Sequence, residues 1–246
     1  MQDVDNNSDV NRRGIAVVIP CFNHAKELAA CLESLTRQTL QPAEVLVVDN
    51  VSEDHPEAIA EGFKDSLPLR IIRFTEKQGA PAARNHGAES TTSARLIFLD
   101  ADVVLETNAL AHLSDALDKN AEAAFAYSNF YWDFKKFPSR PWDIAALHKM
   151  NYIHTTALVR RKAFPGFDET LKKFQDWDLW LTMAKNGAKG VFVDEYLFRV
   201  KQRSSGISSW LPSFIHKVPW PIFGWMPKEI KKYRDAEKII RMKHGI

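Results

Sequence analysis

The stretch Phe98-Leu99-Asp100-Ala101-Asp102-Val103 ends an apolar run in two carboxylates that stand one residue apart. Because successive side chains of a strand point to opposite faces, Asp100 and Asp102 are expected to point the same way at the exposed carboxyl end of a buried strand. Oxygen ligands in that arrangement suit Mg²⁺ or Mn²⁺, which complete their coordination with substrate phosphates and water. The stretch therefore predicts a nucleotide site, and its neighbours in sequence must decide between that site and a merely solvated strand end.

The composition limits the number of domains and the classes of partner. The chain has 246 residues, 45% of them hydrophobic and 26% charged, which suits one large domain or a domain with an added lobe. A net charge of +2 is too small to indicate nucleic-acid binding, and no nucleic-acid partner is expected. Cys21 and Cys31 lack the spacing of a thiolate metal site and are expected to stay reduced.

The same sequence contains no apolar run of about 18 residues, the length that a membrane-spanning helix needs. Residues 1–13 are polar, predict a flexible tail and do not resemble a secretory signal. We therefore expect a cytoplasmic protein, either free or peripheral at the inner face of the membrane.

Short apolar runs alternate with segments of helical periodicity in the first half of the chain. The expected strands are 15–19, 44–49, 69–74 and 95–100, and the expected helices are 25–38, 56–64, 80–90 and 108–120. Continuous apolar strands that alternate with helices indicate an α/β fold with a mostly parallel sheet covered on both faces. After residue 123 the alternation loosens, and a mixed sheet is expected there.

Ligands of such sheets lie outside the carboxyl ends of the strands. The loops expected at that edge contain acids, amides and small residues suited to a base, a ribose or a phosphate: Pro20, Phe22, Asn23, Asp49, Asn50, Gly79, Asp100, Ala101 and Asp102. Arg84 lies one turn inside the helix after Gly79, where a guanidinium can reach a uracil-type base or a phosphate; an exposed helix arginine is the alternative. No G-x-G-x-x-G or Walker pattern is present, so dinucleotide and P-loop readings are weak.

In the second half, Gly166-Phe167-Asp168 predicts a turn, and a helix is expected from about residue 175 to Asn186, where Gly187 stops it. Its first turn contains Asp176 and Asp178.

Five motifs in this order resemble the family 2 glycosyltransferases of the GT-A fold, over roughly residues 15–205. They are Val18-Ile19-Pro20-Cys21-Phe22-Asn23, Val47-Val48-Asp49-Asn50, Gly79-Ala80-Pro81-Ala82-Ala83-Arg84-Asn85, Leu99-Asp100-Ala101-Asp102, and Gly166-Phe167-Asp168 with Gln175-Asp176-Trp177-Asp178-Leu179. The resemblance implies a Rossmann-like sheet with a nucleotide-binding half at 14–105 and an acceptor and catalytic-base half at 106–205. Residues 206–246 would form a separate aromatic and basic segment.

The resemblance also implies an activity: an inverting transfer of a sugar from a nucleotide diphosphate, most simply a UDP-sugar, to an acceptor hydroxyl of a cell-surface polysaccharide or a lipid-linked glycan. It places Asp176 as the catalytic base and Asp102, with Asp100, on a Mn²⁺ or Mg²⁺ ion. The carboxyl-edge residues named above, with Arg84, would bind the donor. Sugar transfer leaves negative charge on a pyrophosphate, which a bound cation stabilises.

Two positions depart from the family. Gln175 stands where members usually have Glu, which removes a like charge beside Asp176 and would lower the pKa of that base. Lys201 stands where many relatives have a metal-binding His; its ammonium can neutralise the pyrophosphate but leaves the third metal ligand open. We expect Asp178 to be structural, and Trp177 and Trp180 to border the acceptor or to belong to the core.

Alternatives remain at this stage. Gln175 motivates a nucleotide-sugar-binding protein without turnover, and Asp100-Ala101-Asp102-Val103-Val104 also fits the nucleophile loop of haloacid-dehalogenase-type phosphatases, although the run from 15 to 95 is then unexplained. In the C-terminal segment 206–246, aromatic residues next to a basic helix suit peripheral contact with an anionic membrane, or equally a helical tail packed on the catalytic domain. The sequence does not indicate an oligomeric state.

Overall fold

Four parallel strands form the first half of a mixed sheet. In the computed structural model, which describes residues 14–201 and 227–246, they lie side by side in the order β3-β2-β1-β4. Their bounds are β1 (Ile15–Cys21), β2 (Glu44–Asp49), β3 (Leu69–Arg73) and β4 (Arg95–Phe98). Every adjacent pair among them is parallel, as the uninterrupted apolar runs predict.

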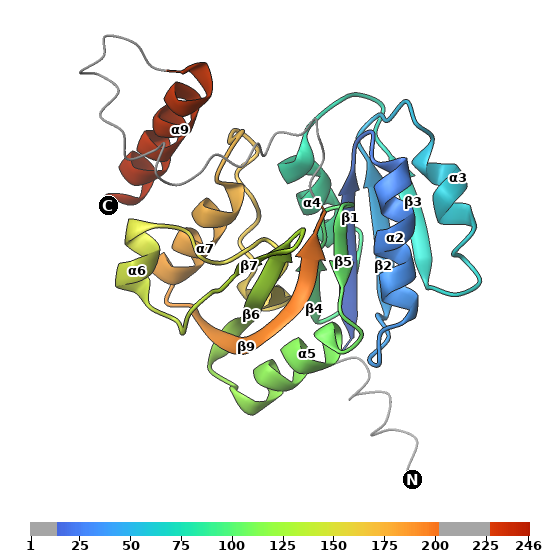
Figure 1. Ribbon diagram of the computed structural model, residues 1–246, viewed down its shortest axis with the longest axis horizontal. Helices are drawn as coiled ribbons and strands as arrows, with labels where there is room; N and C mark the ends of the chain where they lie inside the picture. Colours follow the sequence, from blue (N-terminus) through green and yellow to red (C-terminus); the bar gives the residue numbers. More distant parts are fainter. Residues whose placement is uncertain (1–13, 202–226) are drawn as a thin grey trace.

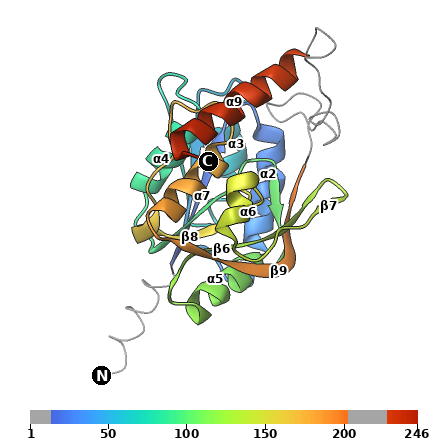
Figure 2. The same cartoon turned by 90° about the vertical axis from the view of Figure 1, so that its left-hand side faces the viewer.

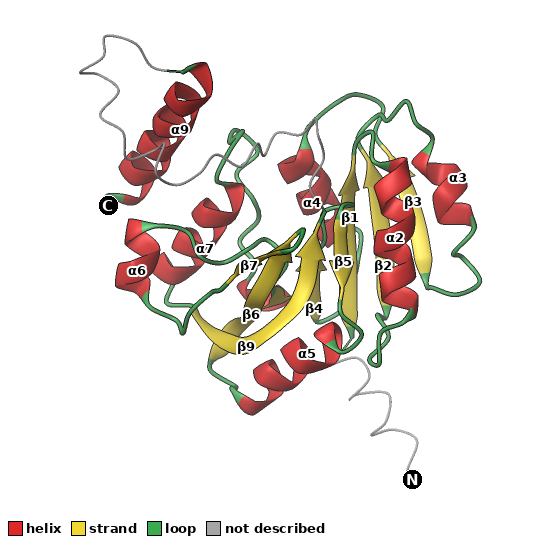
Figure 3. Ribbon diagram, in the orientation of Figure 1, coloured by secondary structure: helices red, strands yellow, loops and turns green. Residues whose placement is uncertain are grey.

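The second half of the sheet is mixed. β8 pairs with β4 in the antiparallel sense, β6 pairs antiparallel with β8 and parallel with β9, and β5 closes the described sheet antiparallel to β9. β7 forms a hairpin with the end of β6. The bounds are β5 (Val103–Leu105), β6 (Ala123–Trp132), β7 (Lys135–Phe137), β8 (Leu158–Arg160) and β9 (Lys189–Val200). The mixed second half is thus confirmed (Figure 3).

Helices cover both faces of this sheet (Figure 1). Alternate residues of β1 show the division: Val17 and Ile19 pack with one set of helices, and Ala16 and Val18 pack with the other. The first set is α2 (Ala25–Thr36), α3 (Pro56–Glu61) and α5 (Ala109–Lys119); the second is α4 (Ala80–Glu89), α6 (Ile144–Lys149), α7 (Gln175–Lys185) and α9 (Lys228–His244). A short 3₁₀ turn, η1 (Arg161–Ala163), follows β8.

Helix α4 lies unusually close to β1 because Gly87 has no side chain. A Cβ at Gly87 would stand 2.3 Å from Cγ1 of Val18. This close contact fixes the height of α4 over the sheet, and with it the position of Arg84 one turn earlier.

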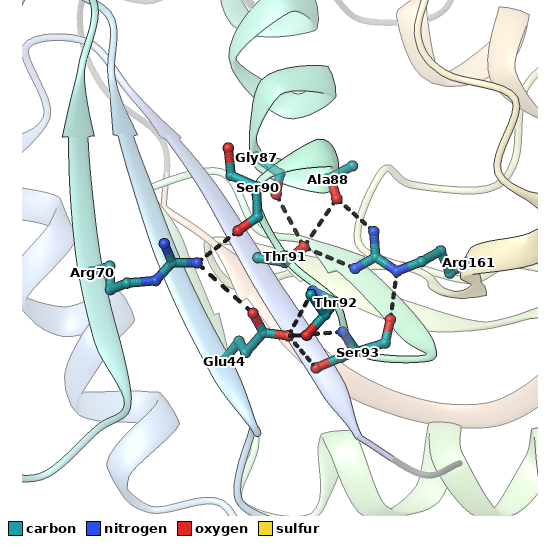
Figure 4. A network of polar contacts seen from close by, with 9 residues as sticks. All are labelled: Glu44, Arg70, Gly87, Ala88, Ser90, Thr91, Thr92, Ser93 and Arg161. Atoms are coloured by element: carbon teal, nitrogen blue, oxygen red, sulfur yellow. Dashed lines mark hydrogen bonds and ion pairs between the residues drawn. The ribbon is translucent and has the colours of Figure 1, made fainter. Parts of the chain in front are cut away.

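The turn from α4 into β4 is fixed by polar contacts at the amino edge of the sheet (Figure 4). Oε1 of Glu44 accepts hydrogen bonds from the backbone and hydroxyl groups of Thr92 and Ser93. Arg161 donates to the carbonyl groups of Ala88 and Ser93. These contacts lie at the opposite end of the strands from the predicted ligand site. They fix α4 and β4, which position that site, relative to each other.

The expected strand 95–100 ends earlier than the sequence suggests. β4 stops at Phe98, and the N–H of Val103 donates to the carbonyl of Asp100 over 2.9 Å, so Asp100, Ala101 and Asp102 form a turn. The chain turns here because β5 pairs with β9 and does not continue β4. Strand alternation therefore does not place Asp100 and Asp102 on one face, and that step of the sequence argument was wrong.

Helix α9 packs against α7 (Figure 2). Asp178, 3% exposed, accepts from Lys243 over 2.9 Å and lies 2.7 Å from Nε2 of His244. The basic part of the predicted C-terminal segment is therefore a docked helix. Its aromatic part, 206–226, and the predicted tail 1–13 lie outside the described residues. In the described part of the chain, no helix has the length and apolarity to cross a membrane.

Candidate functional site

The candidate site lies at the carboxyl edge of the parallel strands, where β1 has β2 on one side and β4 on the other. From β1 the chain continues to β2 and β3 on one side and then returns to β4 on the other side, so the strand order reverses at β1. A crevice between the loops after β1 and β4 is expected at such a reversal. Three of the predicted residues belong to the loops on either side, namely Asn23 after β1 and Asp100 and Asp102 after β4.

The loops on the β2 side are tied together by side-chain amides. Oδ1 of Asn50 accepts from the N–H groups of Gln78 and Gly79 over 2.8 and 3.2 Å. Oδ1 of Asn23 accepts from the N–H of Glu53 over 2.8 Å. The loops after β1, β2 and β3 thus form one connected rim.

Phe22 and Pro20 belong to the same rim. The Lys77 ammonium lies 3.5 Å from the centre of the Phe22 ring, a cation–π contact between the loops after β1 and β3. Pro20 is the second-to-last residue of β1 and pairs with Val48 of β2.

Asp49 is buried and both of its oxygens are engaged. Oδ1 accepts from the N–H of Ser52 over 2.9 Å, and Oδ2 pairs with Arg73 over 2.8 Å. Arg73 lies 24 positions away on β3, and nothing local in the sequence indicated the pair. The carboxylate orders the loop after β2.

That loop contains backbone in the left-handed region. Val51 in this loop has a φ of 65°, and Asn23 in the neighbouring loop after β1 has a φ of 54°. Asparagine adopts this conformation readily, but a β-branched valine does so only where its surroundings impose it. The contacts of the two preceding residues supply that constraint: Asp49 accepts from the N–H of Ser52, and Asn50 accepts from the N–H groups of Gln78 and Gly79.

Arg84 connects the two halves of the fold. From α4 its Nη2 donates to Oδ1 of Asp100 over 2.5 Å, and its Nη1 donates to Oε1 of Gln175 over 2.9 Å. Burial is the largest single influence on Asp100 and would raise its pKa, but the charge and hydrogen bond of Arg84, with contributions from His154 and His24, hold the pKa below its usual range. Asp100 is therefore an anion at neutral pH.

The third guanidinium nitrogen of Arg84 has a different environment. Arg84 is 5% exposed, and its Nε is buried and has no hydrogen-bond partner within the part of the chain that the structure describes. A buried unpaired donor is costly and is satisfied when an acceptor approaches. A hydrogen-bond acceptor on a bound ligand would satisfy this donor.

Asp102 lies in the turn between β4 and β5, beside the end of β9. Its carbonyl accepts from the N–H of Lys201 over 3.0 Å, so the residue that replaces the family's histidine lies next to it. Within residues 14–201 and 227–246, no three carboxylate, imidazole or thiol side chains gather closely enough to hold a metal ion. The carboxylates of Asp102 and Asp100 still fit a Mg²⁺ or Mn²⁺ ion, because such an ion needs only one or two protein carboxylates and completes its shell with phosphate oxygens of the sugar donor.

Asp176 lies in the first turn of α7, where its Oδ2 accepts from Nδ2 of Asn151 over 2.8 Å and its Oδ1 from the N–H of Trp177 over 2.8 Å. Burial is the largest influence on this carboxyl and raises its pKa, with the charge of Asp100 adding to the rise. A carboxylate with a raised pKa is a stronger proton acceptor than an exposed one. Asn151 was not predicted, because nothing in the irregular stretch around it indicates a partner 25 positions away.

The other acid and the tryptophans of α7 are structural. Asp178 faces α9, as described above. Trp180 is fully buried and stacks on Phe125, and Trp177 donates from Nε1 to the carbonyl of Leu147. Both indoles thus belong to the core.

His154 is a further residue that the sequence did not indicate. It packs against the stacked rings of Phe130 and Phe198, and burial lowers its pKa to about 4, against the opposing influence of Asp100. His154 is therefore neutral at physiological pH and adds no charge to the site.

Comparison with known proteins agrees with this geometry. The family described as "Glycosyl transferase family 2" matches residues 16–170. The chain belongs to glycosyltransferase family 2. The matched range contains Asn23, Arg84, Asp100 and Asp102, and ends before α7.

Two curated relatives of this family 2 chain are similar over different lengths. A PGL/p-HBAD biosynthesis glycosyltransferase of Mycobacterium bovis is 30% identical over 187 residues, which cover 70% of each chain. Glycosyltransferase AglE of Haloferax volcanii is 43% identical over 91 residues, covering 36% of this chain and 30% of AglE. The latter match spans about a third of its relative's length.

Solved structures show the GT-A fold. TarS 1–349 of S. aureus in complex with UDP-GlcNAc superimposes with a TM-score of 0.69 at 17% identity, covering 89% of this chain and 69% of TarS. Mannosyltransferase PcManGT of Pyrobaculum calidifontis, in complex with GDP-Man and Mn²⁺, gives a TM-score of 0.60 at 18% identity, covering 78% and 57%. Membership of family 2 sets the phosphatase alternative aside, because the family accounts for the run from 15 to 95 that a phosphatase left unexplained.

Proposed function

We propose that this family 2 glycosyltransferase transfers a sugar, with inversion, from a UDP-sugar to an acceptor hydroxyl in cell-surface polysaccharide or lipid-linked glycan synthesis, and that it depends on Mn²⁺ or Mg²⁺. One observation carries the proposal: Gln175, the residue before Asp176, accepts a hydrogen bond from Arg84 over 2.9 Å, and Arg84 also pairs with Asp100 of the donor half. The proposed base and the proposed donor-binding pair therefore lie close together.

The Asp176 carboxylate takes the proton of the acceptor hydroxyl while the acceptor oxygen bonds to the anomeric carbon. The bond from that carbon to the diphosphate oxygen breaks, and its electron pair leaves with the diphosphate. A single displacement of this kind inverts the anomeric centre. Asn151 holds the carboxylate in one orientation during the transfer.

The donor half of the proposal rests on the loops after β1 to β4. The rim of Asn23, Asn50 and Gly79 with Asp49 would hold the nucleoside, and the free Nε of Arg84 would donate to the base. Asp102 would hold the cation and Lys201 would add positive charge near the diphosphate. The cation, when bound, supplies Lewis-acid stabilisation of the leaving diphosphate. The complexes of TarS with UDP-GlcNAc and of PcManGT with GDP-Man and Mn²⁺ support this assignment by analogy.

A donor panel tests the proposal. The full chain is incubated with UDP-, GDP- and dTDP-sugars with Mn²⁺, with Mg²⁺ and with EDTA, and thermal shift identifies the donor. Transfer to a lipid-linked or polysaccharide acceptor extract is then followed by release of the nucleoside diphosphate, and NMR of the product gives its anomeric configuration. Retention of configuration, or full transfer in EDTA, would contradict the proposal.

A binding protein without turnover is the second candidate, and Gln175 is the observation that favours it. The amide accepts from Arg84, where the family's usual glutamate would add a negative charge. Donor binding that is not followed by release of nucleoside diphosphate with any acceptor or with water would select this candidate.

Peripheral contact with an anionic membrane is also part of the proposal. The face of α9 turned away from α7 exposes Lys231, Lys232 and Lys238 together with Ile239 and Met242, which are 49% and 66% exposed. Basic and apolar side chains on one helix face suit an anionic lipid surface. Flotation with vesicles that contain anionic lipid, of the full chain against Ile239→Ser with Met242→Ser, tests it; equal flotation of both would contradict this role of the helix.

A further inference from the structure

Helix α9 contacts both chain segments that hold the proposed base. The hydrogen bond between Asp176 and Asn151 joins the start of α7 to the segment that follows α6. These two segments are separate in the sequence, so their relative position decides whether the hydrogen bond forms.

The carboxyl end of α6 is capped from outside. A helix leaves its last carbonyl groups without intrahelical partners. Here Nη1 of Arg241 donates to the carbonyl of His148 over 3.2 Å, and Nη2 donates to that of Lys149 over 3.0 Å. Nε1 of Trp177 donates to the carbonyl of Leu147 over 2.7 Å. The three last carbonyls of α6 are thus bound by a residue of α9 and a residue of α7.

Arg241 also contacts α7 directly. Its guanidinium lies 5.4 Å from the centre of the Trp177 ring, and Trp177 is the residue after Asp176. Its Nε donates to Glu237 one turn earlier on α9 over 3.0 Å, which fixes the orientation of the guanidinium plane. One side chain therefore holds the neighbour of Asp176 and the end of the helix that leads to Asn151.

A second contact of α9 reaches the other neighbour of the base. The ring of Tyr233 packs edge-on against Phe174 with the ring centres 4.9 Å apart. Phe174 has a φ of 59°, a conformation that a bulky residue holds only under constraint. Tyr233 packs against the residue at which the chain enters α7.

The geometry points to Arg241 as a positioning residue for the transfer step: it keeps the segment after α6 and the start of α7 in register so that Asn151 meets Asp176. This inference rests on the proposed role of Asp176 as the base. It assigns the C-terminal helix a part in catalysis although the helix lies outside the range that matches the family.

Steady-state kinetics of Arg241→Ala and Arg241→Lys test the inference. Lys228→Ala, an exposed position on the same helix, is the matched control. We expect Arg241→Ala to lower kcat about tenfold, with the donor KM unchanged, because a displaced base costs rate and not donor affinity. The acid limb of the kcat profile should move to higher pH, because the carboxylate of Asp176 loses a hydrogen bond that favours its charged form. Arg241→Lys keeps the charge and the helix propensity, so this variant should fold. Its kcat should lie between those of the parent chain and of Arg241→Ala.

A double-mutant cycle with Asn151→Ala gives the decisive comparison. If Arg241 acts through Asn151, Arg241→Ala adds little to the loss that Asn151→Ala already causes. Losses that multiply, or an Arg241→Ala chain with the kinetics of Lys228→Ala, would overturn the inference. Asp176→Asn, measured alongside, separates the two claims: activity that survives it overturns the proposed base, whereas its inactivity together with unchanged Arg241→Ala kinetics overturns the positioning role alone.

Discussion

Arg84 on α4 donates a hydrogen bond to Oε1 of Gln175 on α7 over 2.9 Å, across 91 positions of sequence. The contact joins the donor-binding half to the half that contains the proposed base. Because Gln175 is neutral, Asp100 is the carboxylate that pairs with Arg84, and its low pKa follows from that pairing.

Gln175→Glu is expected to move the acid limb of the kcat profile to higher pH. The new carboxylate adds a like charge next to Asp176, whose pKa burial already raises, so the base becomes harder to deprotonate. The shift should be roughly half to one pH unit. Gln175→Asn is the control, since it shortens the side chain without adding charge and should leave the limb in place. An unmoved limb in Gln175→Glu would mean that Asp176 is not the titrating base.

Asp176→Asn should abolish transfer and keep donor binding. Loss of a general base lowers kcat by roughly 10²–10⁴-fold, whereas the donor loops lie on other elements and should bind UDP with unchanged affinity in calorimetry. Asp178→Asn, two positions on, is the matched comparison.

Asp178→Asn should lower the stability of the chain and leave its transfer activity intact, the reverse of the result expected for Asp176→Asn. It removes the charge of a buried acid that pairs with Lys243 and His244, and should cost about 3 kcal/mol of unfolding free energy. Denaturant unfolding measures that loss, and activity per folded molecule should stay within about twofold of the parent chain. An Asp178→Asn chain that is stable but inactive would exchange the roles assigned to the two acids.

Asp102→Ala and Asp100→Asn should separate metal binding from nucleoside binding. We expect Asp102→Ala to remove the enhancement of UDP affinity by Mn²⁺ and to leave the metal-free affinity unchanged. Asp100→Asn removes the partner of Arg84 and should weaken UDP binding both with and without the ion. Calorimetric titrations in Mn²⁺ and in EDTA measure the four combinations, and an unchanged Mn²⁺ effect in Asp102→Ala would remove this residue from the metal site.

Lys243→Gln should cost less stability in acid than at neutral pH. The hydrogen bond from Lys243, together with those from Thr170, lowers the pKa of Asp168 from 3.8 to about 2. The part of the stabilisation that comes from the Lys243–Asp168 pair is therefore complete above about pH 4 and is lost as the pH falls toward about 2. The difference in Tm between the parent chain and Lys243→Gln should therefore narrow over that interval. A Tm difference that stays constant down to pH 2 would exclude the Lys243–Asp168 ion pair as its source. Lys238→Gln, on the same helix, should show no difference at any pH.

The fold and the donor half of the site could be predicted because their signals are local. Apolar runs such as 44–49 and 95–98 become parallel strands, and the topology then places Asn23, Asp49 and Asp100 at one edge. The turn at Asp100 to Asp102 could not be predicted from alternation, because it depends on the pairing of β5 with β9 far along the chain. Asn151 and Arg241 escaped prediction for a similar reason: their partners are backbone carbonyls and a carboxylate 25 to 93 positions away, and no local pattern encodes such contacts.

Val51 has a consequence for affinity. A valine at a φ of 65° holds roughly 1–3 kcal/mol of conformational strain. The bonds of Asp49 and Asn50 hold the loop in this shape before any nucleotide arrives, so the cost of the strained backbone is met when the chain folds. A nucleotide that meets an already ordered loop loses none of its binding free energy to shaping it.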